Sequence, residues 1–309
     1  KDMLPCLGDL PITDIRRGDV LQVIRRIERR GALVSARKVR TWLNQIFRFA
    51  MAEGLIEVNP AADLDIVAEP PRPVRHNPFL KVSELSVLLD MIARSSCAET
   101  TILGIRLLLL TGVRTGELRA ATPDQFDLEN GIWSVPPEGV KQLRGRVRTQ
   151  ADEVPPYLVP LSTQAMRIVK RLMQMKGRGA RYLLVHRLEP QAMISENTLN
   201  IAISRMGFKG RLTGHGIRAT ISTALNEVGF VEEWIEAQLS HADTNKIRAA
   251  YNHAEYVDQR RRMMQYWADL LDVLEGGGNL PIAEAYMAGG GRSSTVSENP
   301  TRTTSIFLI

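Results

Sequence analysis

A proline-rich stretch in the first third of the chain constrains its fold more than any other sequence feature. Residues 69–78 read EPPRPVRHNP, with four prolines in ten positions. Each proline fixes its own backbone torsion and removes an amide donor, so this stretch cannot continue a helix. Segments of this composition are extended and semi-rigid. We therefore expect residues 69–79 to link two separately folded units, residues 1–68 and residues 80–275.

The first unit is predicted to be helical and strongly basic. Apolar residues recur at helical spacing between residues 16 and 30, Gly31 interrupts them, and Ser35 is expected to cap a second helix. Residues 16–48 contain ten Arg or Lys residues and only two acidic ones. A solvated helix face usually mixes the two signs, whereas charge of one sign is typical of a surface that contacts phosphates. The candidate phosphate contacts are Arg16, Arg17, Arg25, Arg26, Arg29, Arg30, Arg37, Lys38 and Arg40.

The second unit is predicted to be mostly helical with a small antiparallel sheet. Residues 126–135 read as strand, Glu-Asn-Gly turn and strand, the pattern of a β-hairpin, and another strand is expected at residues 157–161. Helical patterns fill most of residues 163–274. Residues 276–309 are rich in Gly, Ser and Thr, a composition that cannot bury enough apolar area, so we expect an unstructured tail there. The fold class is therefore mainly α.

Composition narrows the class of protein further. The net charge is +6 and the sequence pI is about 9.5, which admits a polyanionic partner. The longest apolar run, residues 103–113, is broken by Arg106 and is shorter than the roughly 20 residues that span a bilayer. Two cysteines, Cys6 and Cys97, are too few for a disulfide framework or a zinc site and favour a reducing cytoplasm. Because Lys1 opens the chain without a signal-peptide pattern, we expect a fragment or a processed start.

Six polar residues of the second unit carry the candidate chemistry. Taken singly, each has an ordinary structural explanation, since an arginine at a helix start is usually a surface or ion-pair residue. Their order along the chain is more informative, because it reads Arg, Lys, His-x-x-Arg, His, Tyr. Glu117 follows the first arginine by three residues, which is one helical turn. The six are Arg114, Lys141, His215, Arg218, His241 and Tyr251.

In this order, and in the strings around it, the sequence resembles the tyrosine recombinases, in particular the integrases of prophages and genomic islands. The resemblance covers residues 8–275 and implies a helical core-binding domain followed by a mixed α/β catalytic domain, the two forming a clamp around double-stranded DNA. The matching strings are LLLLTGVRTGELRAAT, VPLSTQA, TGHGIRATISTALNEVGF, WIEAQLSHADTNKIRAAYNHAEY and RRRMMQYWADLLD.

The resemblance implies a nucleophile and a phosphate clamp. Tyr251 would attack a backbone phosphate, form a 3′-phosphotyrosine bond and release a 5′-hydroxyl, so that the energy of the broken link is kept and no ATP is needed. Guanidiniums offer forked donors matched to the non-bridging oxygens, which suits Arg114 and Arg218 to stabilise the transition state. Glu117 would hold an arginine in place.

Three further groups would move protons or donate hydrogen bonds. Lys141 is the candidate general acid for the departing 5′-oxygen, although residues 141–153 form a longer stretch than is usual in the family. His215 would be a base or hydrogen-bond partner near the tyrosine, and His241 a further donor to the phosphate. Tyr256, five residues after Tyr251, is a rival candidate for the nucleophile. The alternative is that Tyr256 is a packed or surface aromatic residue of the following helix. No metal or other cofactor is implied.

The resemblance predicts a site-specific recombinase that integrates or excises a mobile element. The alternatives are an inactive DNA-binding relative and a DNA-relaxing enzyme of topoisomerase type. We expect a monomer in solution and a homotetramer on attachment-site DNA, in the bacterial cytoplasm, with a directionality factor as a further candidate partner. Residues 257–274 carry an apolar stripe at helical spacing, which would cover either its own domain or a neighbouring protomer.

Overall fold

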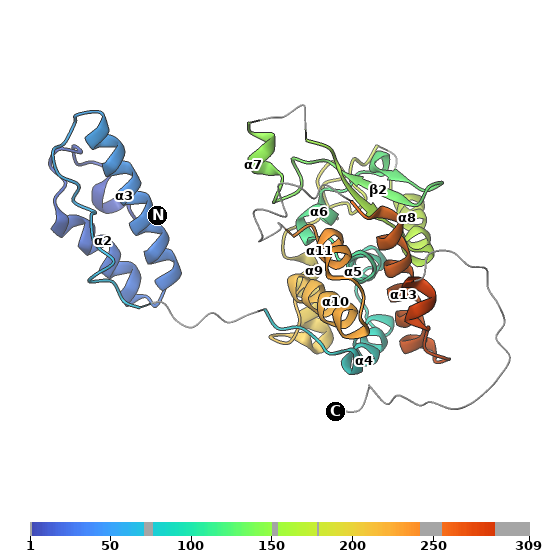
Figure 1. The fold of residues 1–309 in the computed structure, drawn as a ribbon. Helices are drawn as coiled ribbons and strands as arrows, with labels where there is room; N and C mark the ends of the chain where they lie inside the picture. The colour runs from blue at the N-terminus through green and yellow to red at the C-terminus, as the bar shows by residue number, and fades with distance from the viewer. Residues whose placement is uncertain (1, 71–76, 150–153, 178, 242–254, 288–309) are drawn as a thin grey trace. The chain divides into compact units, whose positions relative to one another are not determined.

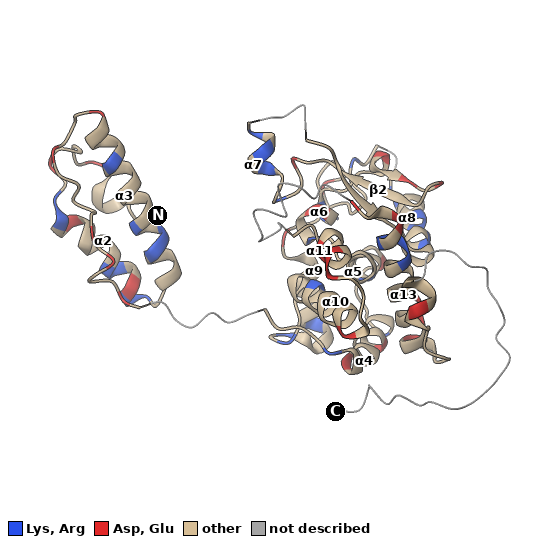
Figure 2. Cartoon of the chain, in the orientation of Figure 1, with Lys and Arg blue, Asp and Glu red and all other residues tan. Residues whose placement is uncertain are grey.

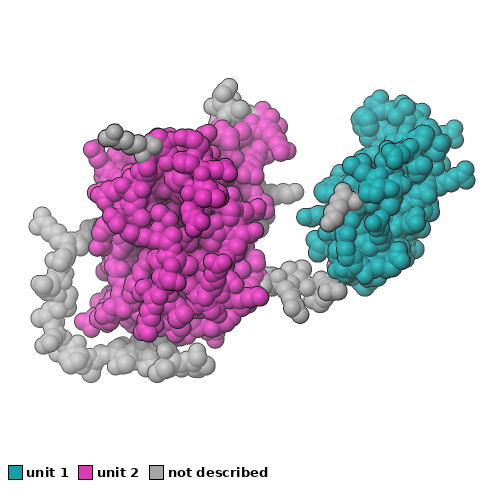
Figure 3. Space-filling view, turned by 180° about the vertical axis from the view of Figure 1, so that it is seen from behind, with its two compact units in different colours: residues 1–76 teal, residues 77–309 magenta. Residues whose placement is uncertain are grey.

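The computed structural model describes residues 2–70, 77–149, 154–177, 179–241 and 255–287 (Figure 1). The chain divides into two compact units, an N-terminal unit, Lys1–His76, and a C-terminal unit, Asn77–Ile309 (Figure 3). Among the described helices, none combines the length and the apolar character that crossing a bilayer requires.

The N-terminal unit is built on two helices, α2 (Arg17–Arg29) and α3 (Leu33–Ala52), preceded by the short α1 (Leu4–Leu7). Gly31 turns the chain between α2 and α3 with φ of 73°, as the sequence predicted. The predicted cap at Ser35 is wrong. The Ala32 carbonyl already accepts the Ala36 N–H, so α3 starts at Leu33 and Ser35 lies inside its first turn. The core of the unit consists of Leu7, Val20, Val23, Ile24, Ile27, Ala36, Val39, Leu43, Phe47, Ala61 and Leu64.

A three-stranded antiparallel sheet in the order β1-β2-β3 confirms the predicted hairpin and third strand. The strands are β1 (Phe126–Asp127), which follows the 3₁₀ turn η1 (Pro123–Gln125), β2 (Ile132–Val135) and β3 (Tyr157–Pro160). Trp133 lies opposite Phe126 on one side and Val159 on the other. Between β2 and β3 the chain forms the short helix α7 (Arg144–Val147), where no helix was expected.

Helix α5 (Glu99–Thr111) is the centre of the C-terminal unit. Its apolar residues lie on all sides of the helix, and it is accordingly surrounded by other helices, with Ile105, Leu107 and Leu108 fully buried. The neighbours that pack against it include α8 (Thr163–Met175), α9 (Thr198–Ile203), α10 (Gly214–Val228) and α13 (Val257–Gly276). The remaining elements are α4 (Val82–Ala93), α6 (Thr115–Arg119), the π-helical turn η3 (Ser204–Phe208) and α11 (Glu232–Gln238).

The apolar stripe of α13 lies inside its own domain. Met263, Met264 and Trp267 are fully buried, and the indole N–H of Trp267 donates to the carbonyl of Leu109 in α5 at 2.7 Å. Of the two alternatives that the sequence left open, the structure therefore shows the first, in which the stripe is covered by its own domain.

The chain after α13 is ordered further than predicted. Helix α13 continues to Gly276, and a short helix, α14 (Ala283–Met287), packs back on it through a Tyr286 hydroxyl that donates to Asp269 at 2.7 Å. The expected unstructured tail from residue 276 therefore does not begin there. Residues 288–309 lie outside the described residues.

Candidate active site

The first arginine of the predicted set lies at the corner between α5 and α6. Gly112 ends α5 with φ of 67°, and a side chain there would also lie within 2.9 Å of Leu239. Arg114 follows as the N-cap of α6. Its backbone N–H and its Nη1 donate to the two carboxylate oxygens of Glu117, at 2.8 and 2.9 Å. Glu117 is buried, and these two hydrogen bonds hold the guanidinium of Arg114 in place.

The second arginine is brought to the same corner by a close helix approach. A Cβ on Gly214 would lie 2.3 Å from a methyl group of Thr115, so only glycine lets the N-terminus of α10 meet the start of α6. Arg218 lies one turn into α10 and is 3% exposed. Its Nη1 donates to the carbonyl of Gly112, close to Arg114 in the chain, and its Nε is buried without a hydrogen-bond partner in the described part of the chain.

Both arginines also hold the end of α11. Three consecutive carbonyls, those of Gln238, Leu239 and Ser240, accept hydrogen bonds from the Tyr157 hydroxyl, Arg218 Nη2 and Arg114 Nη2. The last carbonyls of a helix lack partners within it, and here three side chains from β3, α10 and α6 supply them. The position at which the chain leaves α11 is thereby fixed against both guanidiniums.

His215 and Arg218 carry pKa shifts that reflect this crowding. Burial lowers the pKa of His215, and the positive charges of Arg218, Arg114, His241 and Lys141 lower it further. His215 is therefore neutral at pH 7. Burial, followed by the charge of Arg114, lowers the pKa of Arg218 to about 10, which still leaves this guanidinium protonated.

The structure places five of the six predicted catalytic residues. His241 lies three residues after the end of α11, and its Nδ1 lies 2.7 Å from a carboxylate oxygen of Glu236. Lys141 has an exposed side chain in the connection between β2 and α7, and its charge acts on His215. Tyr251 lies outside the described residues. The rival Tyr256 is half-buried at the N-cap of α13.

The basic residues predicted in the N-terminal unit divide into two groups. Arg25 pairs with the buried Glu28 at 3.0 Å and donates to the carbonyl of Val67, and Arg30 pairs with Asp2 at 2.8 Å. These two arginines are engaged in holding the unit together. The other predicted residues are exposed or half-buried: Arg16, Arg17, Arg26, Arg29, Arg37, Lys38 and Arg40. Figure 2 shows Lys and Arg on both helices of this unit and along α7 of the C-terminal unit.

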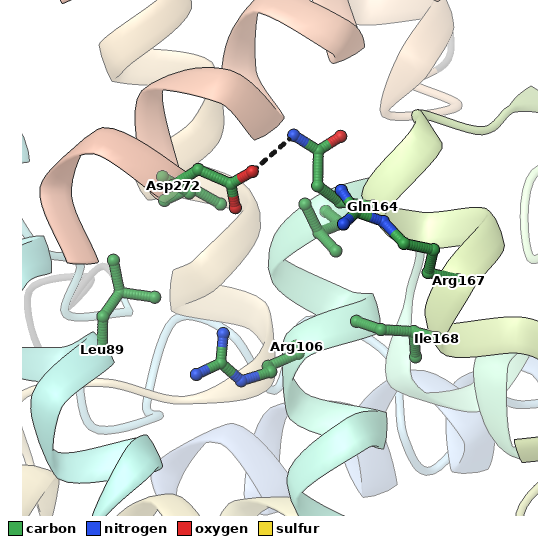
Figure 4. Close-up of a pocket in the computed structure, with 8 residues that line it drawn as sticks. Leu89, Arg106, Gln164, Arg167, Ile168 and Asp272 are labelled. Atoms are coloured by element: carbon green, nitrogen blue, oxygen red, sulfur yellow. Dashed lines mark hydrogen bonds between the residues drawn. The ribbon is translucent and has the colours of Figure 1, made fainter. Parts of the chain in front are cut away.

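A hollow of about 250 Å³ elsewhere on the C-terminal unit is lined from α4, α5, α8 and α13 (Figure 4). Two of its polar side chains already bond within the protein. Gln164 donates to Asp272 at 2.8 Å, and Arg106 pairs with Glu275. None of the predicted site residues lines this hollow, so it is separate from the arginine corner. Within the described ranges, no group of three His, Cys, Asp or Glu residues could hold a metal ion.

The sequence interpretation did not single out four residues that the structure places around the site: Tyr157, Glu236, Gln238 and Arg260. One of them left a usable signal. Arg260 precedes Met263, Met264 and Trp267 by three, four and seven residues, so it lies on the buried face of α13. A buried arginine on an apolar stripe requires a polar partner, which points to a structural or functional network.

Two guanidiniums at one corner, with a neutral histidine beside them, form an arrangement suited to binding a tetrahedral anion. Comparison with models of known protein families shows which class of protein this chain belongs to. Residues 78–257 match the model described as the phage integrase family, and residues 1–66 match the phage integrase central domain. The chain belongs to the phage integrase family.

Individual relatives agree with this assignment. The chain is 38% identical over 281 residues to prophage integrase IntZ of Escherichia coli K12, covering 90% of the chain and 66% of that protein. It is 32% identical over 277 residues to prophage integrase IntA of the same strain, covering 90% of the chain and 64% of IntA. The chain thus spans about two thirds of the length of these relatives.

Solved structures share the fold. One is a lambda integrase (75–356) dimer bound to a COC′ core site, with a TM-score of 0.56 and 18% identity over 80% of this chain and 85% of that one. Another is the Tn1549 transposon integrase (82–397) in complex with circular intermediate DNA, with a TM-score of 0.56 and 19% identity over 80% and 84% of the two chains.

Proposed function

We propose that this chain is a site-specific DNA recombinase that cleaves and rejoins double-stranded DNA through a 3′-phosphotyrosine at Tyr251, and so integrates or excises a mobile element. The observation that carries the proposal is the pair of guanidiniums at the corner of α5, α6 and α10. Each uses two of its N–H groups on protein acceptors, and Arg218 Nε is buried without a partner in the described structure. A buried donor without an acceptor is unfavourable, so this corner lacks an acceptor that the described residues do not supply.

The proposed reaction gives each of the predicted residues one step. The Tyr251 oxygen attacks phosphorus, the bond from phosphorus to O5′ breaks with its electron pair, and the phosphate stays on the 3′ strand as a tyrosine ester. His215, neutral because of its lowered pKa, accepts the tyrosine proton. Lys141 donates a proton to O5′. Arg114 and Arg218, with His241, stabilise the charge that develops on the non-bridging oxygens.

Glu236 supports the role of His241. Its carboxylate lies on the Nδ1 side of the ring at 2.7 Å, so Nδ1 carries a proton toward Glu236 and the ring orientation is held. The second ring nitrogen, Nε2, is then the one left for the phosphate, and it donates to a phosphate oxygen when it also carries a proton. Glu117 acts in the same way on Arg114, through two hydrogen bonds from a buried carboxylate.

DNA is the proposed partner of both units. The exposed basic residues on α2 and α3 would neutralise DNA phosphates. The arginines of α7, Arg144 and Arg146, would do so beside the strand that is cut. A lambda integrase tetramer has been solved on a Holliday junction, and it shares this fold with a TM-score of 0.56. We extend that assembly to this chain: a monomer in solution, a homotetramer on paired sites in the bacterial cytoplasm, and a directionality factor as a further partner. No feature of the described residues favours an inactive relative or a topoisomerase.

The test is covalent capture of DNA. The chain is incubated with a pool of nicked duplexes whose core sequence is randomised, and DNA held in denaturant-stable adducts is sequenced. The expected result is an adduct with one preferred core sequence, formed by the wild type and lost in Tyr251→Phe and Arg218→Ala. Binding without any adduct would identify an inactive relative, and relaxation of supercoiled plasmid without sequence preference would identify a topoisomerase.

A further inference from the structure

Arg260 is a buried arginine that joins three separate parts of the C-terminal unit. It lies in the first turn of α13 and is 2% exposed. Its Nη1 donates to the carbonyl of Glu255 at 3.0 Å, its Nη2 to the carbonyl of Leu158 in β3 at 2.6 Å, and its Nε to the side-chain oxygen of Gln238 at 3.0 Å. Every nitrogen of the guanidinium is thus committed to an acceptor. Its positive charge also lies over the ring of Tyr157, 5.4 Å from the centroid.

Gln238 carries the network from Arg260 to the arginine corner. Its side-chain amide donates to the carbonyl of Thr111 at 2.7 Å, and Thr111 is the last residue of α5, three positions before Arg114. Its own carbonyl accepts the hydroxyl of Tyr157. Burial raises the pKa of Tyr157, which keeps this hydroxyl protonated as a donor.

These contacts lie at the two ends of one segment. Glu255 immediately follows residues 242–254, which carry Tyr251, and Gln238 is three residues before His241. The flanking residues are strained, since Ser240 and Tyr256 adopt positive φ of 47° and 50° although neither is glycine. Such conformations persist only where surrounding contacts fix them. A single guanidinium therefore contacts both approaches to the segment on which the proposed nucleophile lies.

We propose that Arg260 is a positioning residue for strand cleavage, which, through Glu255 and Gln238, holds both ends of the nucleophile-bearing segment at a fixed distance from Arg114 and Arg218. The inference rests on the proposed function, because it assigns a role relative to Tyr251. Arg260 does not touch the reacting phosphate. It sets where the tyrosine oxygen lies relative to that phosphate, and small misplacements of a nucleophile slow a reaction strongly.

Arginine is required here because of its shape. Three acceptors surround a flat group that donates in three directions, and a lysine ammonium on its single flexible stem cannot reach them all. Lysine nevertheless retains the positive charge and most of the apolar stem. Arg260→Lys therefore removes the connection between the two ends while leaving the charge of the site unchanged, which makes it the informative substitution.

The test compares three variants with the wild type on nicked core-site DNA at saturating concentration. Arg260→Lys removes the connection, and Gln238→Leu removes its link to α5 while keeping the backbone carbonyl that Tyr157 contacts. Leu270→Ala is the matched control, because Leu270 is a buried core residue of the same helix, 3% exposed, and contributes no side-chain hydrogen bond to the segment's ends. Rates of adduct formation, DNA affinity and melting temperature are measured for each folded protein.

Positioning predicts a specific pattern. Both connection variants should form adduct about 100-fold more slowly, with DNA affinity within about twofold of wild type. The double variant should be no slower than either single one, because both changes break the same connection. Leu270→Ala should melt at lower temperature but cleave at the wild-type rate. Wild-type rates in both folded connection variants, multiplicative slowing in the double variant, or equal slowing in folded Leu270→Ala would each overturn the inference.

A second measurement does not depend on catalysis. Lys246 and Arg248 lie in the segment and are sites for trypsin. Limited proteolysis should cut after them faster in Arg260→Lys than in the wild type or in Leu270→Ala, and equal cutting rates would contradict the connection. If the wild type forms no adduct at all, the proposed function fails, while the proteolysis comparison still decides whether Arg260 holds the segment.

Discussion

Removal of α13 and α14 should unfold the C-terminal unit. A stop codon after residue 256 deletes five large apolar side chains that are at most 5% exposed: Met263, Met264, Trp267, Leu270 and Leu271. Burying one such side chain contributes about 1.5–3 kcal/mol. Together they contribute about 10 kcal/mol, which is comparable to the whole stability of an ordinary domain, about 5–15 kcal/mol. The truncated unit is therefore not expected to keep its core.

A single substitution in α13 should destabilise the C-terminal unit without unfolding it. Trp267→Ala should destabilise the unit by about 4 kcal/mol, since it leaves a cavity beside α5 and removes the hydrogen bond to Leu109. For a unit of this size the melting temperature should fall by about 10 °C. Circular dichroism during heating measures both variants. A stop codon after residue 287 is the matched control, because it removes no described contact, and its melting curve should match that of the full chain.

The result that would refute this reasoning is a truncated chain that still melts cooperatively near the wild-type temperature. That outcome would mean that α13 is dispensable for folding, and docking of the helix on a neighbouring protomer would again be the better explanation of its apolar stripe. Light scattering on paired DNA sites would then show whether the truncated protein loses assembly.

Three further predictions concern the site and its charges. Glu117→Gln should slow adduct formation about 10–100-fold and destabilise the unit by about 3 kcal/mol, measured by urea unfolding, because the buried carboxylate is the ion-pair partner of Arg114. The pKa of His215 is lower in the folded chain than its ordinary value near 6.5. The contribution of His215 to stability is therefore complete above about pH 6.5 and is lost as pH falls through the folded pKa. The free energy of unfolding of the wild type should accordingly fall relative to that of His215→Gln between pH 7.5 and 5. Parallel curves of unfolding free energy against pH for the two proteins would contradict the shift. Neutralising Arg29 and Lys38 should make the dependence of DNA affinity on log salt shallower by about one unit per lost phosphate contact. The control neutralises two ion-paired arginines of the C-terminal unit and should leave the slope unchanged: Arg94 and Arg171.

Local sequence signals predicted the elements that depend on neighbouring residues. The Glu-Asn-Gly turn specified the hairpin because Asp127 accepts the amides of Glu129 and Asn130, and Gly131 takes a positive φ of 63°. Helix α8 begins at Thr163, where the helical pattern was expected to start, and the Ser162 hydroxyl caps it. The order of the polar motifs likewise predicted which arginines meet.

Contacts between distant segments could not be predicted in this way. The burial of the α13 stripe depends on the shape of α5 and β3, and a helical period states that a face is buried but not against what. The side chains of Arg114 and Arg218 donate to the backbone carbonyls of Ser240 and Leu239, and no residue pattern encodes which carbonyl a side chain will meet. The start of α3 was predicted too late, with Ser35 as its cap. The turn at Gly31 already brings the Ala36 N–H to the Ala32 carbonyl, so the helix starts without a capping side chain.

The central claim is that Tyr251 forms the covalent bond to DNA, and mapping the adduct by mass spectrometry tests it most directly. After nuclease and trypsin digestion, residues 249–260 form one peptide that contains both Tyr251 and Tyr256, so fragmentation within it assigns the added nucleotide. The account predicts the added mass on Tyr251, with no adduct in Tyr251→Phe and adduct retained in Tyr256→Phe. A nucleotide on Tyr256, or an adduct that survives in Tyr251→Phe, would contradict it.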